Sequence, residues 1–236
     1  MELNTAAYVG LDVHKDTIAV AIAKPGRGEA WSYGVIDNSE ASVKRLLDKL
    51  AAKFDGSLAF CYEAGPCGYG LYRRIIASGH RCLVAAPSLM PRRPGDRVKT
   101  DRRDALNLAR LHRGGELTAV WVPDAEREAM RDLVRARQDM KSFQRQARQR
   151  LLAFLLRHDR VYDGGTKNRT LRHKRWLEEQ RFEHPAQQVV FQEYLDMVKD
   201  ATRRVASLKR QMEMHLQDWS MRPVVEALIS LRGVSV

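Results

Sequence analysis

The chain has 236 residues, 44% of them hydrophobic and 30% charged, which is enough apolar content to bury the core of one large domain or two modest ones. Its 41 Lys and Arg outnumber 29 Asp and Glu, and the net charge of +12 favours a polyanionic partner such as nucleic acid. No apolar run reaches the roughly 18 residues of a membrane span, and no leader pattern opens the chain, so we expect a cytoplasmic protein without a membrane partner.

The first 115 residues alternate between strand-like and helix-like patterns. Three β-rich runs, at roughly residues 7–13, 17–23 and 30–36, come first and are expected to form an antiparallel meander. A helix over "NSEASVKRLLDKLAAKF" follows, then the buried strand "SLAFCYE", a helix near "YGLYRRIIASG" and the buried strand "HRCLVAAP". Because strands separated by helices pair in parallel, these patterns predict a mixed α/β sheet with an antiparallel hairpin at one edge.

Two long helical patterns dominate the rest of the chain. After Pro123, apolar residues recur at seven-residue spacing, and a second series follows the interruption "DGGTKNRTLRHKR". Such stripes are equally compatible with an antiparallel hairpin within one chain and with pairing to a second subunit. The first series is Leu133, Met140, Ala147 and Phe154, and the second is Val190, Tyr194, Met197, Ala201, Val205, Leu208, Met212 and Trp219.

The positive charge is concentrated in this helical part. Residues 127–175 contain fifteen Lys or Arg and five Asp or Glu, and so hold ten of the twelve net positive charges. We expect this stretch to bind a polyanion such as nucleic acid, with an affinity that falls steeply with salt. The candidate contacts are Arg145, Arg148, Lys174 and Arg175.

Four carboxylates are candidates for a metal site. Asp12 lies in a hydrophobic strand, on the same strand face as His14, where an unpaired charge is costly. Glu63 ends a strand expected beside the first, and Asp101 and Asp104 share one face of the helix that follows. If the four acids converge at one sheet edge, they suit two magnesium ions roughly 4 Å apart, an arrangement that cleaves phosphodiesters.

These residues also have simpler interpretations. Thr100 is a suitable N-cap, and acids in a first helical turn are favoured by the helix dipole, so Asp101 and Asp104 are expected there without any metal. His14 is more often an ordinary turn residue than a metal ligand or phosphate contact. The basic residues nearby would contact phosphate beside the metals, although a solvated basic face has the same pattern; they are Arg92, Arg93, Lys99, Arg102 and Arg103.

Three segments, "YVGLDVHKDT", "FCYEAGPCGYGLYR" and "VKTDRRDALNLARL", carry the four acids in an order and local context that resembles the DEDD transposases. This insertion-sequence family includes bridge-RNA-guided recombinases and related site-specific invertases. The resemblance implies a ribonuclease-H-like domain over residues 1–122, akin to the Holliday-junction resolvases, with the four acids as its magnesium-binding catalytic quartet. It also implies a coiled-coil domain over residues 123–220 that joins subunits into a homo-oligomer and helps hold a structured guide RNA, with donor and target DNA as further partners.

The resemblance stops near the end of the chain. Residues 221–236 resemble only the start of the family's C-terminal transposase domain, which carries a catalytic serine, and Ser235 is too near the end to take that role. We therefore expect a transposase that lacks this serine domain and is incomplete for strand exchange.

Three other classes remain open at this point. A junction-resolving or other magnesium-dependent nuclease would use the same four acids. An actin-like sugar kinase also has an aspartate near its opening hairpin, but prefers small residues where this chain has His14 and Lys15. In a non-catalytic nucleic-acid-binding dimer the acids would only cap helix N-termini and form ion pairs with basic side chains. Metal binding separates this last class from the first two.

Overall fold

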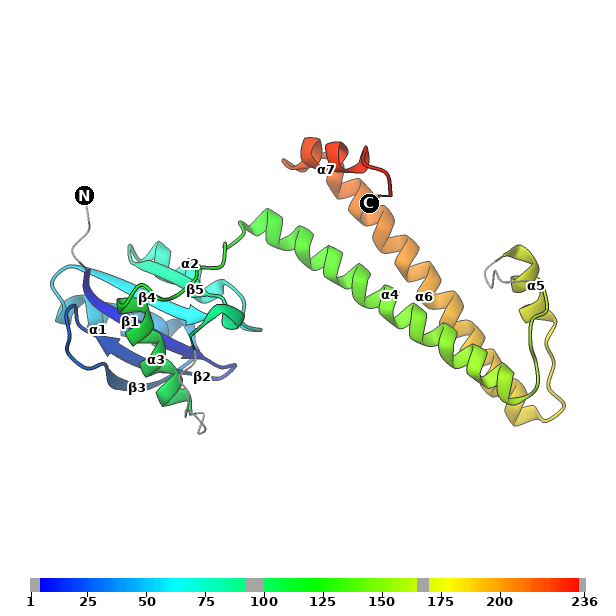
Figure 1. The fold of residues 1–236 in the computed structure, drawn as a ribbon, viewed down its shortest axis with the longest axis horizontal. Helices are drawn as coiled ribbons and strands as arrows, with labels where there is room; N and C mark the ends of the chain where they lie inside the picture. Colours follow the sequence, from blue (N-terminus) through cyan, green and yellow to red (C-terminus); the bar gives the residue numbers. More distant parts are fainter. Residues whose placement is uncertain (1–4, 92–99, 165–169, 234–236) are drawn as a thin grey trace. The chain divides into compact units, whose positions relative to one another are not determined.

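The computed structural model describes residues 5–91, 100–164 and 170–233. The chain divides into two compact units, Met1–Val122 and Pro123–Val236. In the first unit, five strands form one sheet in the order β3-β2-β1-β4-β5, with helices on both faces (Figure 1). Its elements are β1 (Thr5–Val13), β2 (Thr17–Ala23), β3 (Trp31–Asp37), α1 (Glu40–Lys53), β4 (Ser57–Glu63), α2 (Gly70–Ala77), β5 (Arg81–Ala85), a short 3-10 helix (Pro87–Leu89) and α3 (Asp101–Arg113).

The strand directions identify the sheet. β1, β2 and β3 form the predicted antiparallel meander, whereas β4 pairs in parallel with both β1 and β5. Only β2 therefore runs against the other four strands. This order and these directions are those of a ribonuclease-H-like sheet, so the predicted mixed α/β fold class is confirmed for this unit.

One face of the sheet carries the main core. Alternation along β1 directs Val9 and Leu11 to this face, where they meet Leu58 and Phe60 of β4 and the apolar stripes of α1 and α2. Helix α1 begins at the N-cap Ser39, whose side chain accepts a hydrogen bond from the backbone amide of Ser42, and its buried residues follow helical spacing. The side chains of the opposite sheet face are much smaller.

Helix α3 packs against that second face, which is built from alanines. Ala19, Ala21 and Ala23 of β2 meet Ala105 and Ala109 of α3 in a separate small cluster. At Gly10 of β1 a Cβ atom would overlap with the carbonyl oxygen of Ala105 and the amide nitrogen of Ala109. The absence of a side chain at Gly10 is therefore what allows α3 to lie this close to β1.

The second unit is a hairpin of two long helices. Its elements are α4 (Ala125–Arg157), α5 (Leu171–Glu179), α6 (Pro185–Gln217) and α7 (Arg222–Ile229). Glu126 near the start of α4 accepts a hydrogen bond from Ser220 just beyond α6, and Gln144 donates one to Thr202 over 2.8 Å. The two helices are therefore antiparallel, as Figure 1 also shows, and the predicted long antiparallel helices are present.

The apolar stripes of this hairpin agree with the sequence pattern on α4 but not at the start of α6. Ala147 and Phe154 are buried, as their seven-residue spacing predicts. At the start of α6, however, Phe191 is 1% exposed and the predicted Val190 is 39% exposed, so the buried stripe there is one residue out of phase, whereas the predicted Ala201 and Met212 further along are buried. The reason is the end of the hairpin, where Phe191 packs in a cluster with Leu177 of α5.

One expectation from composition can be compared with the structure. Within residues 5–91, 100–164 and 170–233, no helix has the length and apolar character needed to cross a membrane. All three cysteines are free thiols: Cys61 is buried, Cys82 is half-buried and Cys67 is exposed.

Candidate metal centre

The sheet and α3 bring acids from distant parts of the sequence together at the carboxyl-terminal ends of β1 and β4. β1 and β4 are neighbouring parallel strands, and Leu11 is paired with Tyr62. Because both of these side chains belong to the main core, the next residues, Asp12 and Glu63, point toward the other face, which α3 covers. Asp101 is the first residue of α3, so the close packing of that helix determines how near Asp101 comes to β1.

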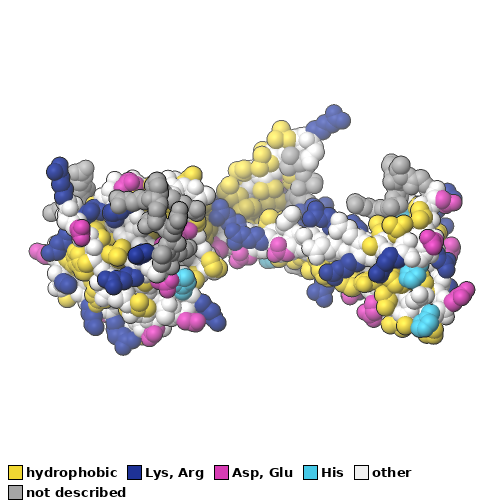
Figure 2. All heavy atoms as spheres, turned by 60° about the horizontal axis from the view of Figure 1, so that its bottom comes forward, with side chains coloured by type: hydrophobic (Ala, Val, Ile, Leu, Met, Phe, Trp, Pro, Cys, Tyr) yellow, Lys and Arg dark blue, Asp and Glu magenta, His cyan; other side chains and the backbone are white. Residues whose placement is uncertain are grey.

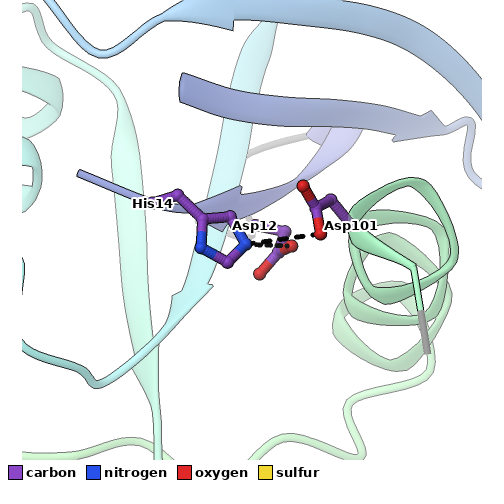
Figure 3. Close-up of side chains that lie close together, drawn as sticks. All are labelled: Asp12, His14 and Asp101. Carbon is purple, nitrogen blue, oxygen red and sulfur yellow. Dashed lines mark hydrogen bonds and ion pairs between the residues drawn. The ribbon is translucent and has the colours of Figure 1, made fainter. Parts of the chain in front are cut away.

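Three side chains converge at this edge, as Figure 3 shows. The Nε2 atom of His14 lies 3.1 Å from Oδ2 of Asp12 and 3.5 Å from Oδ1 of Asp101. One donor atom from each of the three residues lies within 4.8 Å of the other two. The side chain of Asp12 is 16% exposed, whereas those of His14 and Asp101 are 55% and 61% exposed, so the cluster is anchored in the sheet and open on its outer side.

The electrostatics of Asp12 reflect its burial first and its charged neighbours second. Burial raises the pKa of the Asp12 carboxyl above its ordinary value, and the charges of Asp104 and Asp101 raise it further. The charge and hydrogen bond of His14 act in the opposite direction. A bound cation would relieve both the repulsion and the cost of burying this carboxylate. Two carboxylate oxygens and one imidazole nitrogen form a donor set that fits a divalent metal ion.

The other two predicted acids lie nearby but outside this group of three. Asp104 is half-buried one turn along α3 from Asp101, close enough for its charge to act on Asp12. Glu63 is half-buried at the end of β4. The four acids thus lie on the elements that the sequence analysis assigned to them, and their joint role as metal ligands remains a prediction.

The helix-cap interpretation of this segment is also correct. The side chain of Thr100 accepts a hydrogen bond from the backbone amide of Arg103, and Asp101 and Asp104 lie in the first turn of α3. Capping and metal binding are therefore not exclusive, because the cap fixes the turn from which Asp101 reaches Asp12.

The predicted nucleic-acid contacts are distributed over both units. Arg92, Arg93 and Lys99 lie outside the described residues. Arg102 and Arg103 are exposed on the first turn of α3, beside the candidate metal centre. In the second unit Arg145 lies exposed on α4, Arg148 is half-buried, and Lys174 and Arg175 lie exposed on α5. Figure 2 shows Lys and Arg side chains on the visible surface of both units, with acidic side chains between them.

His14 is the residue that sequence reasoning undervalues. Its position two residues after Asp12, on the same strand face, is visible in the sequence, but an ordinary turn residue is the more common interpretation of such a histidine. The structure places its ring between the two aspartates, because the backbone of the β1–β2 turn is closed by a hydrogen bond from the His14 amide to the carbonyl of Thr17.

Comparison with known proteins is consistent with these observations. Residues 9–158 match the DEDD transposase family of the IS110 type, which is described as a transposase. The chain belongs to this family. It is 50% identical over 231 residues to the putative transposase y4qE of Sinorhizobium fredii, covering 98% of this chain and 55% of that protein. It is 34% identical over 228 residues to the transposase for insertion sequence element IS1533 of Leptospira borgpetersenii, covering 96% of this chain and 66% of that protein.

The DEDD transposase chain therefore spans little more than half the length of the first of these relatives and about two thirds of the second. Among solved structures, Thermus thermophilus RuvC aligns with 48% of this chain and 99% of its own, at 13% identity and a TM-score of 0.32. The family resemblance inferred from the three sequence segments is confirmed.

Proposed function

We propose that this chain is part of a transposase that carries out magnesium-dependent DNA strand cleavage and exchange in the transposition of an insertion sequence, guided by a structured RNA, with a serine domain needed to complete the exchange. The observation that supports this most directly is that Asp12 of β1 and Asp101 of α3 converge at the exposed carboxyl-terminal end of β1. The chain in which they converge belongs to a transposase family. Asp12, Glu63, Asp101 and Asp104 would together hold two magnesium ions.

The site has the features that phosphodiester cleavage requires. When bound, the metal ions would activate the attacking oxygen and stabilise the leaving oxygen. Asp12 is held rigidly, because its strand is paired on both sides within the sheet. The exposed side of Asp101 leaves room for a DNA backbone, and Arg102 and Arg103 on the same helical turn would neutralise its phosphates.

The helical unit would hold the RNA and a second subunit. Its basic residues, Arg145, Lys174 and Arg175 among them, supply charge for a phosphate backbone. Phe143, three residues after Met140 of the seven-residue series on α4, is 40% exposed, and an exposed apolar side chain in this stripe favours association with another copy through a coiled coil. Figure 2 shows hydrophobic and basic side chains side by side on the visible face of the helical unit. A serine domain, as expected from the family resemblance, would complete strand exchange.

Thermal melting with and without millimolar magnesium tests the metal site. Magnesium should raise the melting temperature of the wild-type protein, because an ion that binds only the native state stabilises it. Asp12→Asn and Asp104→Asn should remove most of this response, and each should raise the metal-free stability by removing a repulsive charge. Magnesium-dependent nicking of branched DNA should be lost in the same two variants.

Asp55→Asn is the matched control, because Asp55 is an exposed aspartate of the same unit that lies in the turn between α1 and β4. It should keep the full magnesium response. If magnesium raises the melting temperature equally in the wild type and all three variants, the acids do not form a shared metal site. They would then serve only as helix caps and ion-pair partners.

A further inference from the structure

We propose that His14 is itself a metal ligand, so that the centre formed with Asp12 and Asp101 holds its ion through one nitrogen and at least two carboxylate oxygens. This inference rests on the proposed function and deepens it. A centre with an imidazole ligand discriminates between metals, since nitrogen donors favour first-row transition ions whereas magnesium prefers oxygen. The site would therefore accept magnesium but bind an ion such as Co²⁺ more tightly than an all-oxygen site does.

The spacing of the donor atoms fits this role. In an octahedral centre with bonds of about 2.1 Å, neighbouring ligand atoms are separated by about 3.0 Å and opposite ones by about 4.2 Å. The Nε2 atom of His14 is 3.1 Å from the Asp12 oxygen and 3.5 Å from the Asp101 oxygen, and one donor atom from each of the three residues lies within 4.8 Å of the other two. An ion can therefore be coordinated by all three with only small side-chain movements.

The backbone of His14 is also held in place. Its amide donates to the carbonyl of Thr17 over 2.9 Å, and its own carbonyl accepts a hydrogen bond of 2.7 Å from the side chain of Asn38. Asn38 in turn donates its backbone amide to the carbonyl of Asp16. The turn that presents the imidazole is thus fixed from both sides before any ion arrives, which lowers the entropy cost of ligation.

The alternative is that His14 only pairs with Asp12 through their hydrogen bond. The two roles differ in whether a metal–nitrogen bond forms, so the bond itself should be measured. Mn²⁺ bound to the 236-residue protein serves as a paramagnetic probe, and electron spin echo envelope modulation detects directly coordinated nitrogen. We expect nitrogen modulation in the wild-type protein, a change of its pattern on labelling histidine with ¹⁵N, and its loss in His14→Ala.

His215→Ala is the matched control, since His215 is an exposed histidine on α6 in the other unit. It should leave the nitrogen signal unchanged. In parallel calorimetric titrations, His14→Ala should weaken Co²⁺ binding at least about tenfold and Mg²⁺ binding less than about threefold.

The outcomes separate this inference from the proposed function. Mn²⁺ that binds in a manner sensitive to Asp12→Asn but shows no coordinated nitrogen would overturn the role of His14 and leave the acidic centre standing. A nitrogen signal that survives in His14→Ala would also overturn it. Mn²⁺ binding that Asp12→Asn leaves unchanged would refute the acidic centre itself. If His14→Ala does not fold, the ¹⁵N-labelled wild type and Asp12→Asn still decide the question.

Discussion

Gly10→Ala is expected to separate α3 from the sheet and thereby open the candidate metal centre. The new Cβ would meet the Ala105 carbonyl and the Ala109 amide, which are backbone atoms and cannot rotate away. To regain ordinary van der Waals separation, α3 must move outward as a body by about 1 Å. Overpacking of this kind typically costs about 1–3 kcal/mol. The same shift would carry Asp101 away from Asp12 and weaken the response to magnesium.

Hydrogen–deuterium exchange followed by peptide mapping is the appropriate measurement, because it reports on α3 separately from the helical unit. Amides of α3 should exchange faster in Gly10→Ala, and magnesium should no longer slow them. Gly70→Ala is the control: Gly70 is the first residue of α2, and a Cβ there has open space. That change should be neutral or stabilising by up to about 1 kcal/mol. If Gly10→Ala alters α3 exchange no more than Gly70→Ala does, the close-packing argument is refuted.

Three further outcomes follow from other parts of the chain. Burial and the charge of Arg81 lower the pKa of His112 to about 4. Below pH 6.5 the imidazole of the unfolded chain therefore binds a proton that the native state does not bind. The free energy of unfolding should fall by up to about 3 kcal/mol as the pH drops from 6.5 to 4. Phe191→Ala should cost about 3–5 kcal/mol in urea unfolding, because it leaves a cavity at the end of the hairpin. The double variant Arg145→Ala, Lys174→Ala should have a shallower slope of log RNA affinity against log salt concentration. The slope should decrease in magnitude by roughly 0.7–0.9 for each RNA phosphate that is no longer neutralised.

Each of these outcomes has a matched control. His112→Gln should flatten the pH dependence between pH 6.5 and 4, and an unchanged profile would assign it to other groups. Val189→Ala, two residues from Phe191 but 62% exposed, should change stability by less than about 0.5 kcal/mol. Lys49→Ala, an exposed lysine on α1, should leave the salt slope unchanged. A slope equally unchanged in the Arg145 and Lys174 double variant would place the RNA surface elsewhere.

The elements that could be predicted from the sequence are those set by local patterns. The alternation in β1, the N-cap at Thr100 and the spacing of Ala147 and Phe154 depend on residues close together in the chain, and the structure agrees with all three. The phase at the start of α6 could not be predicted in this way, although the burial of Ala201 and Met212 further along could. It depends on Leu177 of α5, which reaches Phe191 only after the chain has turned back on itself.

The candidate metal centre shows the same division between local and long-range causes. Strand period and helix capping predict that Asp12 faces one side of the sheet and that Asp101 begins a helix. They do not predict that the two carboxylates meet, since that distance depends on how closely α3 approaches β1. The approach is set by the small side chains of Gly10 and of the alanines on β2 and α3. The sequence does not show that these residues pack against each other, so it does not predict the close approach. The same cause explains His14: beside Asp12 alone it has the pattern of a turn residue, and only the placement of Asp101 brings three potential donor atoms within 4.8 Å of one another.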